Sequence, residues 1–414
     1  MIIMKMKTCR FCNAELKQVF VDLGMSPLAN SFLSLDMLGK KENLYPLRVF
    51  VCNHCLLVQL EEFESAENIF TNYAYFSSYS DTWLTHAENY VNMIISRFNF
   101  NSKNQIVEIA SNDGYLLQFF KKKGIPILGI EPAKNVAKVA EEKGIPTITK
   151  FFGTKTAEEL ASTGKQANLL LGNNVLAHVP NLNDFVSGMK ILLKPEGIIT
   201  MEFPHLLKLI QQIQFDTIYH EHFSYFALFV IQKIFSRHGL VIFDVDELPT
   251  HGGSLRIYAK HVENNTLEIN ENVNAVLKKE EEFGLGDISL YKTFQKKVDK
   301  VKQDVCYFVT KVKKENKKIV CYGAPAKGNT LLNFCELGTT FIDYTVDRNP
   351  HKQGLYLPGT HIPIKSPEKT LETKPDYLII LPWNLKEEIM SQMSYIRNWS
   401  GKFVVFIPKV KIYS

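Results

Sequence analysis

Apolar and polar positions divide the chain into three stretches with different periodicities. Residues 1–65 contain only short segments and no long periodic run. Residues 104–260 alternate between short apolar runs and amphipathic stretches, and the same alternation returns in residues 318–407. Strands that alternate with helices on this scale are typical of βαβ units. The pattern therefore predicts two α/β units, the first of them around a parallel sheet.

The first α/β unit is predicted in most detail, because glycines stop two of its helices. An amphipathic helix precedes the unit and begins at Asp81, which we expect to be its N-cap. Residues 194–197 are predicted to turn into the last parallel strand, and two later strands are expected to add antiparallel at one edge. The predicted strands are 105–109, 127–130, 167–171, 198–203, 240–245 and 255–260, and the predicted helices are 115–123, 133–143, 185–193 and 226–237.

Residues 277–318 are rich in Lys and Glu but carry regularly spaced apolar residues, among them Val298, Val301 and Val305. This composition predicts one or two long exposed helices that connect the units rather than form a core. A solvated charged face explains such a stretch better than a surface for nucleic acid or a partner. Beyond it, the predicted strands are 318–322, 341–346, 376–381 and 402–407, and the predicted helices are 327–335 and 386–396.

Composition narrows the class of protein. Of 414 residues, 45% are hydrophobic and 22% are charged, which excludes wholesale disorder. The net charge of +5 is too small to indicate a nucleic-acid partner, although an anionic small molecule fits it. No apolar run approaches 18 residues and the N-terminal residues lack a signal-peptide core, so we expect a cytoplasmic protein with no membrane partner. The sequence leaves the oligomeric state open, and a monomer is compatible with it.

Four of the seven cysteines form two pairs with the same spacing, Cys9 with Cys12 and Cys52 with Cys55. Two CxxC pairs 39 residues apart match a structural zinc ribbon, in which four thiolates complete a closed tetrahedral site. A redox pair and an iron–sulfur cluster are the alternatives, while disulfides are disfavoured in a reducing compartment. Because a closed site has no open coordination position, we expect this zinc to stabilise the fold away from any chemistry.

Residues 107–115 give the first indication of a ligand, because a strand runs there into a turn of small residues and then a helix. The segment lacks the G-x-G-x-x-G spacing of a dinucleotide site, which disfavours NAD. The next strand ends at Glu131, where a carboxylate can bind two ribose hydroxyls. Glu108 and Asp113 add negative charge that opposes a pyrophosphate and suits a sulfonium or an amino group. These features favour S-adenosylmethionine, and an ordinary α/β turn is the alternative.

Two polar segments are candidates for the chemistry. Asn173, Asn174 and His178 follow a strand at the edge where open α/β sheets bind ligands, although a lone His there is more often structural. Residues 219–222 place two histidines around a glutamate, and His is suited to proton abstraction near neutral pH. A catalytic base is the favoured interpretation, with a metal site and a solvated loop as alternatives.

Three further segments look like ligand surfaces. Residues 73–80 place tyrosines and serines just before a helix, and residues 250–256 combine two glycines, a hydroxyl and a cation. Residues 323–330 follow a strand and open a helix, a setting in which backbone N–H groups bind phosphate. A Walker A loop is absent there, so an anion site that uses Lys327 is favoured over a structural turn.

In this order, the segments resemble the sugar C-methyltransferases of deoxysugar-nucleotide biosynthesis over essentially the whole chain. The resemblance implies an α/β fold with a small N-terminal zinc-binding domain at 1–70 and a central class I methyltransferase Rossmann-like domain at 71–265. Residues 266–414 are then a helical connector and a C-terminal Rossmann-like domain that binds the nucleotide-sugar. The matching segments are the paired cysteines, Pro27–Asn30, Tyr75–Tyr79, Glu108–Gly114, Gly172–Asn174 with His178, Tyr219–His222, His251–Arg256 and Gly323–Thr330.

The resemblance also implies a reaction. In this family a methyl group passes from S-adenosylmethionine to C3 of a nucleotide-linked 4-keto-deoxysugar, usually a dTDP-sugar. The C3 proton lies next to the C4 ketone, so a base can remove it and leave an enolate. His222 is carried over as this base, with Glu221 and Tyr219 orienting it or stabilising the enolate and with Tyr75 near the sugar. Spacing does not decide between His220 and His222.

Binding residues are carried over in the same way. The four paired cysteines would bind zinc, and the diphosphate of the substrate would contact the C-terminal unit. The implied cofactor contacts are Ala110, Ser111, Asn112, Gly114, Tyr115, Glu131, Pro132, Asn173, Asn174 and His178, and the implied substrate contacts are Tyr79, His251, Ser254, Arg256, Lys327 and Asn329.

One residue departs from the pattern, since Ala110 stands where class I methyltransferases often have Gly. Its methyl group puts the detailed contact with the cofactor in question. It does not put the assignment to class I methyltransferases in question. Nothing in the sequence fixes dTDP rather than another nucleotide. Two other functions stay open: a nucleotide-sugar-binding protein without catalysis, against which the histidines of 219–222 argue, and an NAD-dependent sugar-nucleotide oxidoreductase.

Overall fold

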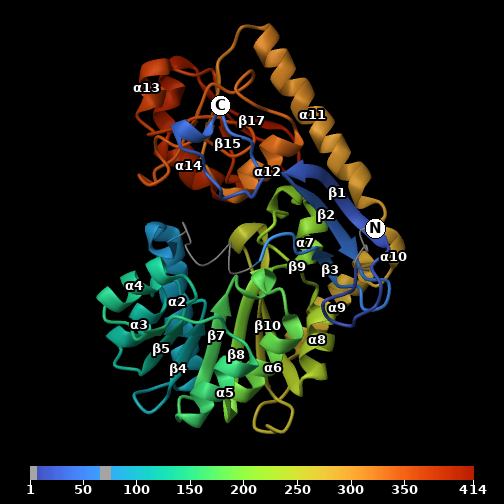
Figure 1. Ribbon diagram of the computed structural model, residues 1–414, viewed down its shortest axis with the longest axis vertical. Helices are drawn as coiled ribbons and strands as arrows, with labels where there is room; N and C mark the ends of the chain where they lie inside the picture. The colour runs from blue at the N-terminus through green and yellow to red at the C-terminus, as the bar shows by residue number, and fades with distance from the viewer. Residues whose placement is uncertain (1–6, 66–75) are drawn as a thin grey trace. The chain divides into compact units, whose positions relative to one another are not determined.

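The computed structural model describes residues 7–65 and 76–414, apart from the side chain of Tyr79. The chain forms two compact units, each assembled from three separate segments of the sequence (Figure 1). The partition into three consecutive domains stays a prediction. Unit 1 consists of Met1–Lys17, Cys52–Leu206 and Glu221–Gly286, and unit 2 consists of Gln18–Val51, Leu207–His220 and Asp287–Ser414.

Unit 1 is built on a seven-stranded sheet in the order β10-β11-β8-β7-β4-β5-β6. Strands β6, β5, β4, β7 and β8 are parallel, whereas β11 is antiparallel to both β8 and β10, as the sequence predicts. Every residue of β4 is buried, as expected for a parallel strand covered on both faces. The strands are β4 (Ile106–Ile109), β5 (Ile127–Ile130), β6 (Thr147–Ile148), β7 (Ala167–Asn173), β8 (Leu193–Pro204), β10 (Leu240–Leu248) and β11 (Ser254–His261).

The helices of unit 1 connect these strands. Helix α2 buries Tyr90, Val91 and Ile94 in the core of the unit, which contains residues from β4, β7 and β11. The helices are α2 (Asp81–Phe98), α3 (Leu117–Lys122), α4 (Lys134–Glu142), α5 (Thr154–Ser162), α6 (Leu182–Leu192), α8 (Leu228–Arg237) and α9 (Glu271–Phe283), with 3₁₀ turns η2 (Ser77–Tyr79), η3 (Leu176–His178) and η5 (Thr250–Gly252).

Two local predictions in unit 1 are wrong. Helix α2 begins at Asp81, but its N-cap is Ser80, which has extended backbone angles and accepts a 3.3 Å hydrogen bond from the N–H of Trp83. The predicted turn at 194–197 is instead part of β8, because pairing with β7 already starts at Leu193. The register with β7 shifts across these residues, so they bulge within the strand rather than precede it.

A short antiparallel strand pair adjoins the paired cysteines in unit 1. Strand β3 (Val58–Leu60) pairs with β9 (Ser224–Tyr225), so that Gln59 lies opposite Ser224. In unit 2, β1 (Gln18–Ser26) pairs antiparallel with β2 (Tyr45–Val51).

Unit 2 contains a six-stranded sheet in the order β14-β13-β12-β15-β16-β17. All of these strands are parallel except β17 at the edge. The strands are β12 (Ile319–Tyr322), β13 (Thr345–Val346), β14 (Ile364–Lys365), β15 (Tyr377–Ile380), β16 (Lys402–Val405) and β17 (Lys411–Tyr413), and the helices are α10 (Ile288–Tyr291), α11 (Phe294–Lys314), α12 (Ala326–Phe334), α13 (Lys369–Thr373) and α14 (Lys386–Gln392). The 3₁₀ turns are η1 (Leu35–Met37), η4 (Phe215–Thr217), η6 (Trp383–Leu385) and η7 (Ser394–Trp399), and α7 (Leu206–Gln211) starts at the last residue of a unit 1 segment.

Helix α11 is not the exposed connector that its charge predicts. Its apolar residues, among them Val298, Val305 and Val309, are fully buried along one face. At its start, the ring of Phe294 stacks on Phe20 with 4.5 Å between the centroids. One face of α11 therefore belongs to the core of unit 2, and the lysines occupy the other face.

Across residues 7–65 and 76–414, no helix combines the length and the apolar character that a membrane span requires.

Candidate functional site

The carboxyl ends of β4 and β7 form the candidate cofactor site of unit 1. Strand order reverses between these two neighbours, and open α/β sheets bind ligands at such a point. The turn after β4 is irregular, since Ala110, Asn112 and Gly114 all have positive φ, at 55°, 50° and 76°. Gly adopts this region without strain and Asn tolerates it, so Ala110 is the residue that the turn holds in an unfavourable conformation.

Several buried polar atoms at this edge have no partner among the described residues. They include both carboxylate oxygens of Glu108, Oγ of Ser111, Nδ2 of Asn173 and Oδ1 of Asn174. Burial raises the pKa of Glu108 well above its usual value, and the charges of Glu131 and Asp113 raise it further. Buried polar groups are nearly always hydrogen-bonded, so this cluster is suited to a polar ligand with both donors and acceptors.

Glu131 lies where the sequence predicts, directly after β5. Its two carboxylate oxygens accept hydrogen bonds from the N–H groups of Ala133, at 2.8 Å, and Asn112, at 2.9 Å. Burial raises its pKa although these N–H groups oppose the shift. The carboxylate thus fixes the turn after β4, and each oxygen has a second lone pair for a ligand hydroxyl. Pro132 is half-buried beside it.

Asp113 and Tyr115 have partners that the sequence does not indicate. The Asp113 carboxylate forms an ion pair with Lys143, at 3.2 Å, and accepts a hydrogen bond from Ser78. The ring of Tyr115 is buried and stacks on Trp83 with 6.1 Å between the centroids. Asp113 therefore adds less negative charge to the site than its position in the sequence suggests.

Glycine is required at position 114. A Cβ atom there would overlap Cδ1 of buried Ile145, and φ is +76°. We expect Gly114→Ala to lower the free energy of unfolding by about 1–3 kcal/mol more than Gly164→Ala and to weaken cofactor binding. Gly164 is the matched control, because its φ is +73° but no atom of the described residues lies within 4 Å of its Cβ position. Urea unfolding and titration with S-adenosylmethionine measure both effects, and equal losses in the two variants would contradict the expectation.

The loop before β11 reaches the same edge of the sheet. His251, with φ of 54°, lies 3.0 Å from Nδ2 of Asn174 through its Nε2 and packs edge-on against Trp83. Ser254 is buried and donates to the carbonyl of Thr250. The structure thus brings His251 and Asn174 together, whereas their binding roles stay predictions.

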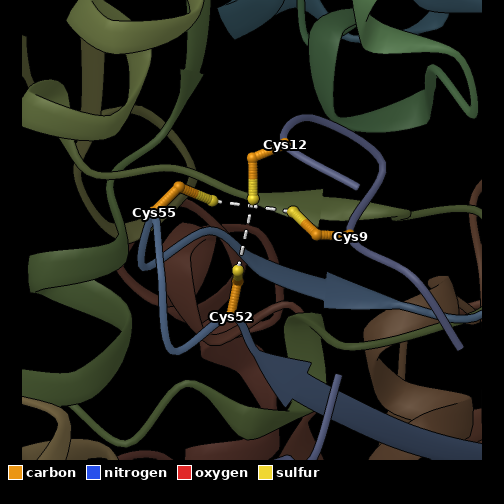
Figure 2. A group of neighbouring side chains, drawn as sticks. All are labelled: Cys9, Cys12, Cys52 and Cys55. Carbon is orange, nitrogen blue, oxygen red and sulfur yellow. Dashed lines mark hydrogen bonds between the residues drawn. The ribbon is translucent and has the colours of Figure 1, made fainter. Parts of the chain in front are cut away.

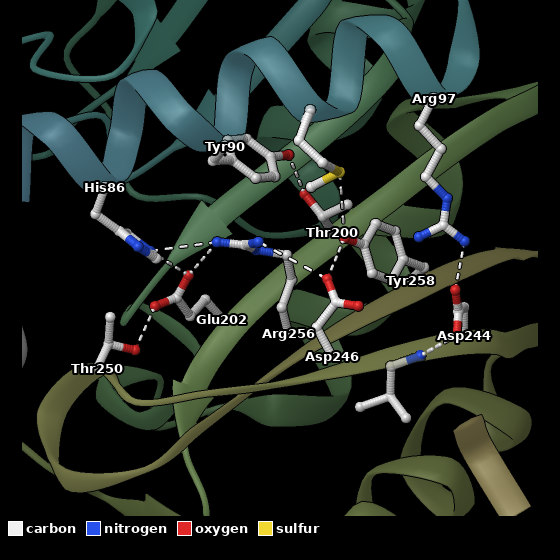
Figure 3. Close-up of polar contacts among 12 residues, drawn as sticks. His86, Tyr90, Arg97, Thr200, Glu202, Asp244, Asp246, Thr250, Arg256 and Tyr258 are labelled. Atoms are coloured by element: carbon white, nitrogen blue, oxygen red, sulfur yellow. Dashed lines mark hydrogen bonds and ion pairs between the residues drawn. The ribbon is translucent and has the colours of Figure 1, made fainter.

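Arg256 lies inside unit 1, in a network centred on Glu202 of β8 (Figure 3). The Glu202 carboxylate accepts from Arg256 at 2.8 Å, from His86 at 2.9 Å and from Thr250 at 2.9 Å. Burial opposes ionisation, but the His86 hydrogen bond and the Arg256 charge hold the pKa of Glu202 at about 2. The guanidinium also stacks over Tyr90. These are the contacts of an internal ion pair, and substrate binding by Arg256 stays a prediction.

His178 and His222 lie against each other. Their ring centroids are 4.7 Å apart at an interplanar angle of 79°, and Tyr225 also packs edge-on against His222 with 6.2 Å between the centroids. Burial lowers the pKa of His178 to about 4, although a hydrogen bond with the backbone of Glu221 raises this pKa. His178 is therefore neutral at physiological pH, and a neutral neighbour does not repel a proton taken up by His222.

His220 and Tyr219 belong to unit 2, because the division of the chain falls between His220 and Glu221. Nε2 of His220 lies 3.3 Å from the carbonyl oxygen of Pro46, and the ring packs edge-on against Tyr45. Burial lowers its pKa. The two histidines of the motif thus have different surroundings. Two other predicted site residues are not tested: Tyr75 lies outside the described residues, and so does the side chain of Tyr79.

The four paired cysteines converge on one point in unit 1 (Figure 2). All four Sγ atoms lie within 4.8 Å of one another, with Cys9 and Cys55 at 3.6 Å and Cys12 and Cys52 at 3.5 Å. Four thiolates about 2.3 Å from one zinc ion in a tetrahedron would be about 3.8 Å apart. The short contacts join one pair to the other, so the cluster fits one closed four-thiolate zinc site.

Both cysteine pairs sit in the same kind of tight turn. The carbonyl of Cys9 accepts from the N–H of Asn13, and that of Cys52 accepts from Leu56, both at 2.9 Å. Asn13 and Leu56 have φ of 61° and 65°. The sequence gives no indication of Gln59, whose Nε2 donates to Sγ of Cys9 at 3.1 Å.

In unit 2, Lys327 is half-buried at the start of α12. Its Nζ donates to Asn384 at 2.8 Å and lies 4.7 Å from the ring centroid of Trp383, which in turn donates to Asp216 at 2.7 Å. Burial raises the pKa of Asp216 to about 6, while the Lys327 charge lowers it. The cluster lies where β12 and β15 pair and the strand order reverses, so it occupies the ligand-binding edge of this sheet.

Asn329 is anchored within unit 2. Its Nδ2 donates to the carbonyl of Ala29 at 2.6 Å, which joins the segments 27–30 and 323–330. Its Oδ1 is buried and has no partner within residues 7–65 and 76–414. The N–H of Ala324 donates to Asp347, so one backbone donor of the loop is already engaged. Diphosphate binding by Lys327 and Asn329 stays a prediction.

Three family models match consecutive parts of the chain. A model described as "Putative zinc binding domain" matches residues 9–70, "Methyltransferase domain" matches 83–245, and "C-methyltransferase C-terminal domain" matches 249–408.

Curated relatives include the C-methyltransferase NovU of Streptomyces niveus. It is 33% identical over 413 residues, which cover 100% of this chain and 98% of that protein. The ubiquinone biosynthesis O-methyltransferase of Bartonella tribocorum is 29% identical over 98 residues, which cover 23% of this chain and 39% of that protein.

Solved structures with partial similarity include the magnesium protoporphyrin IX methyltransferase of Synechocystis, with a TM-score of 0.33 and 15% identity, covering 42% of this chain and 78% of that one. An S-adenosylmethionine-dependent methyltransferase of Clostridium acetobutylicum has a TM-score of 0.36 and 11% identity, covering 43% of this chain and 92% of that one.

Proposed function

The chain belongs to the family of C-methyltransferases, and we propose that it methylates C3 of a nucleotide-linked 4-keto-deoxysugar, in the dTDP form, during branched-chain deoxysugar biosynthesis. The enzyme uses S-adenosylmethionine, and its four-cysteine region binds zinc. The proposal concerns the substrate and the residues that act on it.

The chemistry requires a base. A carbon atom must become a carbanion before it can attack a sulfonium methyl group. In a 4-keto sugar, loss of the C3 proton leaves an enolate with its charge shared by the C4 oxygen. The enolate carbon then attacks the methyl group in line, the S–CH₃ bond breaks, and S-adenosylhomocysteine leaves with the electron pair. The proton stays on the base, which returns it to water.

The observation that carries the proposal is the contact between His178 and His222. A neutral His178 adds no positive charge beside His222, which suits His222 to accept the C3 proton. Glu221 follows the boundary between the units and precedes the base, and we assign it and Tyr219 to orienting the base or the enolate. Tyr75 is proposed to contact the sugar.

The unpartnered buried atoms of unit 1 support the cofactor assignment. We propose that Glu131 binds the ribose hydroxyls, while Glu108 and the turn Ala110–Gly114 accept the amino group of the methionine moiety. Asn173 and Asn174 supply an amide donor and an amide acceptor at the same edge. These acceptors suit a cationic sulfonium and an amino group better than a dinucleotide pyrophosphate.

Lys327 is proposed to bind the diphosphate of the substrate in unit 2. Lys327→Met is therefore expected to raise the KM for the sugar nucleotide by about 10- to 100-fold, the usual effect of one charged hydrogen bond, without changing S-adenosylmethionine affinity. Lys302→Met is the matched control, since Lys302 also lies over an aromatic ring of unit 2, that of Phe334. Steady-state kinetics on both variants measure the KM for the sugar nucleotide. An unchanged KM in Lys327→Met would show that Lys327 does not bind the diphosphate.

A mass-spectrometric screen tests the function itself. The protein is incubated with S-adenosylmethionine and with dTDP-, GDP-, UDP- or CDP-linked 4-keto-deoxysugars, and the products are searched for the mass of one added methyl group. Methylation of the dTDP-sugar is the expected result. Binding of these sugars without any methylation would indicate a binding protein, and binding of NAD but not S-adenosylmethionine would indicate an oxidoreductase.

A further inference from the structure

We propose that Arg10 is a positioning residue, through which the first cysteine pair fixes the segments that carry His178 and His222. This inference rests on the proposed function, because it takes these two histidines as the site of proton abstraction. The sequence leads us to expect a zinc site that lies away from any chemistry. The proposal departs from that expectation for the part of unit 1 that contains Cys9 and Cys12.

Arg10 first contacts the segment of His178. Its Nη1 donates to the carbonyl of Pro180 at 2.8 Å, two residues beyond that histidine. The backbone of the cysteine turn is held to the same region, since Nδ2 of Asn183 donates to the carbonyl of Phe11 at 2.9 Å. Together with the 3.3 Å contact of the same Nδ2 to the carbonyl of Arg10, these hydrogen bonds join the residues between Cys9 and Cys12 to the chain that follows η3.

Arg10 also contacts the segment of His222. Its Nη2 donates to the carbonyl of Leu60 in β3, and the N–H of Leu60 donates to the carbonyl of Phe223 at 3.0 Å. The guanidinium lies 5.3 Å from the ring centroid of Phe223, the residue next to His222. The N–H of Phe223 donates to Ala177 at 2.8 Å, which closes the connection to the other histidine.

The backbone of Arg10 is fixed by the metal site. Its N–H donates to Oε1 of Gln59 at 2.9 Å, and Nε2 of the same amide donates to Sγ of Cys9 at 3.1 Å. Gln59 is buried in β3, the strand that pairs with β9. Its side chain therefore links the ligand sulfur to that strand. The cysteine turn, β3 and the two histidine segments form one connected set of hydrogen bonds.

An arginine is suited to this connection. Its planar guanidinium reaches two carbonyls in different segments with separate nitrogens, while its face packs on an aromatic ring. A lysine keeps the charge but has one nitrogen and no flat face. Arg10→Lys therefore tests the geometry rather than the charge.

The experiment compares Arg10→Lys with Arg237→Lys in the full chain loaded with zinc. Arg237 is the matched control, because its guanidinium also lies over a ring of the cysteine turn, that of Phe11, but it is exposed at the end of α8. Three properties are measured: zinc content, the imidazole resonances of His178 and His222 in ¹³C-histidine-labelled protein, and the kinetic constants. The resonances are assigned from His178→Gln and His222→Gln spectra.

Arg10→Lys is expected to keep one zinc per chain, to shift the resonances of both histidines, and to lower kcat by about 10²-fold with KM nearly unchanged. Arg237→Lys is expected to match the wild type in all three. Unshifted resonances, an equal loss in the control, or loss of zinc from Arg10→Lys would each overturn the proposal. The zinc and resonance measurements need no sugar, so they decide it even if no 4-keto sugar proves to be a substrate.

Discussion

Substitution of His222 by Gln is expected to lower kcat by about 10²–10⁴-fold, the usual contribution of a general base, and to leave S-adenosylmethionine affinity near the wild-type value. The physical reason is the proposed role of His222 as the proton acceptor beside His178, which its pKa of about 4 keeps neutral. Glutamine keeps a polar side chain of similar reach but cannot hold the proton. Steady-state kinetics and calorimetric titration with the cofactor measure the two effects separately.

A second measurement follows the proton itself. In heavy water, the wild-type enzyme is expected to exchange the C3 hydrogen of a 4-keto sugar nucleotide for deuterium, and His222→Gln is expected to lose this exchange. His261→Gln is the control, since His261 lies at the end of β11 and contacts the carbonyl of Leu193. A larger kcat loss in His220→Gln than in His222→Gln would move the base to the other histidine and contradict this assignment.

The sequence predicts those parts of the fold that depend on local pattern. Strand β5 is found residue for residue at 127–130, because a short apolar run ends at a glutamate and a proline. Strand β6 has only two residues, and both are half-buried, so the sequence contains no apolar run from which to predict this strand. Helix α11 is found as a helix but misassigned to the surface, because abundant lysines obscure a narrow stripe of valines that becomes core.

In the candidate site, too, the sequence predicts the residues that a local pattern marks and not those that depend on distant contacts. The four cysteines follow from spacing alone, and Glu131 follows from the end of a strand. Arg10 and Gln59 could not be found, because their roles depend on which strands pair. Arg10 and Pro180 are 170 residues apart in sequence, and no periodicity in either segment points to the other.

Removal of one zinc ligand is expected to have the second large effect. Cys52→Ser leaves three thiolates, and structural zinc sites in small peptides contribute about 10–16 kcal/mol of apparent folding free energy. We expect zinc content to fall below about half an equivalent and the thermal midpoint to fall by about 10 °C, which corresponds to about 4 kcal/mol in a unit of this size. Metal analysis and thermal unfolding followed by circular dichroism measure the two quantities.

The matched control is Cys306→Ser, because Cys306 is a half-buried thiol of unit 2 outside the four-cysteine cluster. It is expected to keep a full equivalent of zinc. If Cys52→Ser also kept its zinc and its midpoint, the four thiols would not be a structural metal site. If it lost zinc and kept its midpoint but lost activity, the metal would serve the histidine segments rather than the stability of unit 1. Loss of zinc together with a lower thermal midpoint is the expected result, because Gln59 and β3 connect the cysteine turns to the rest of the unit.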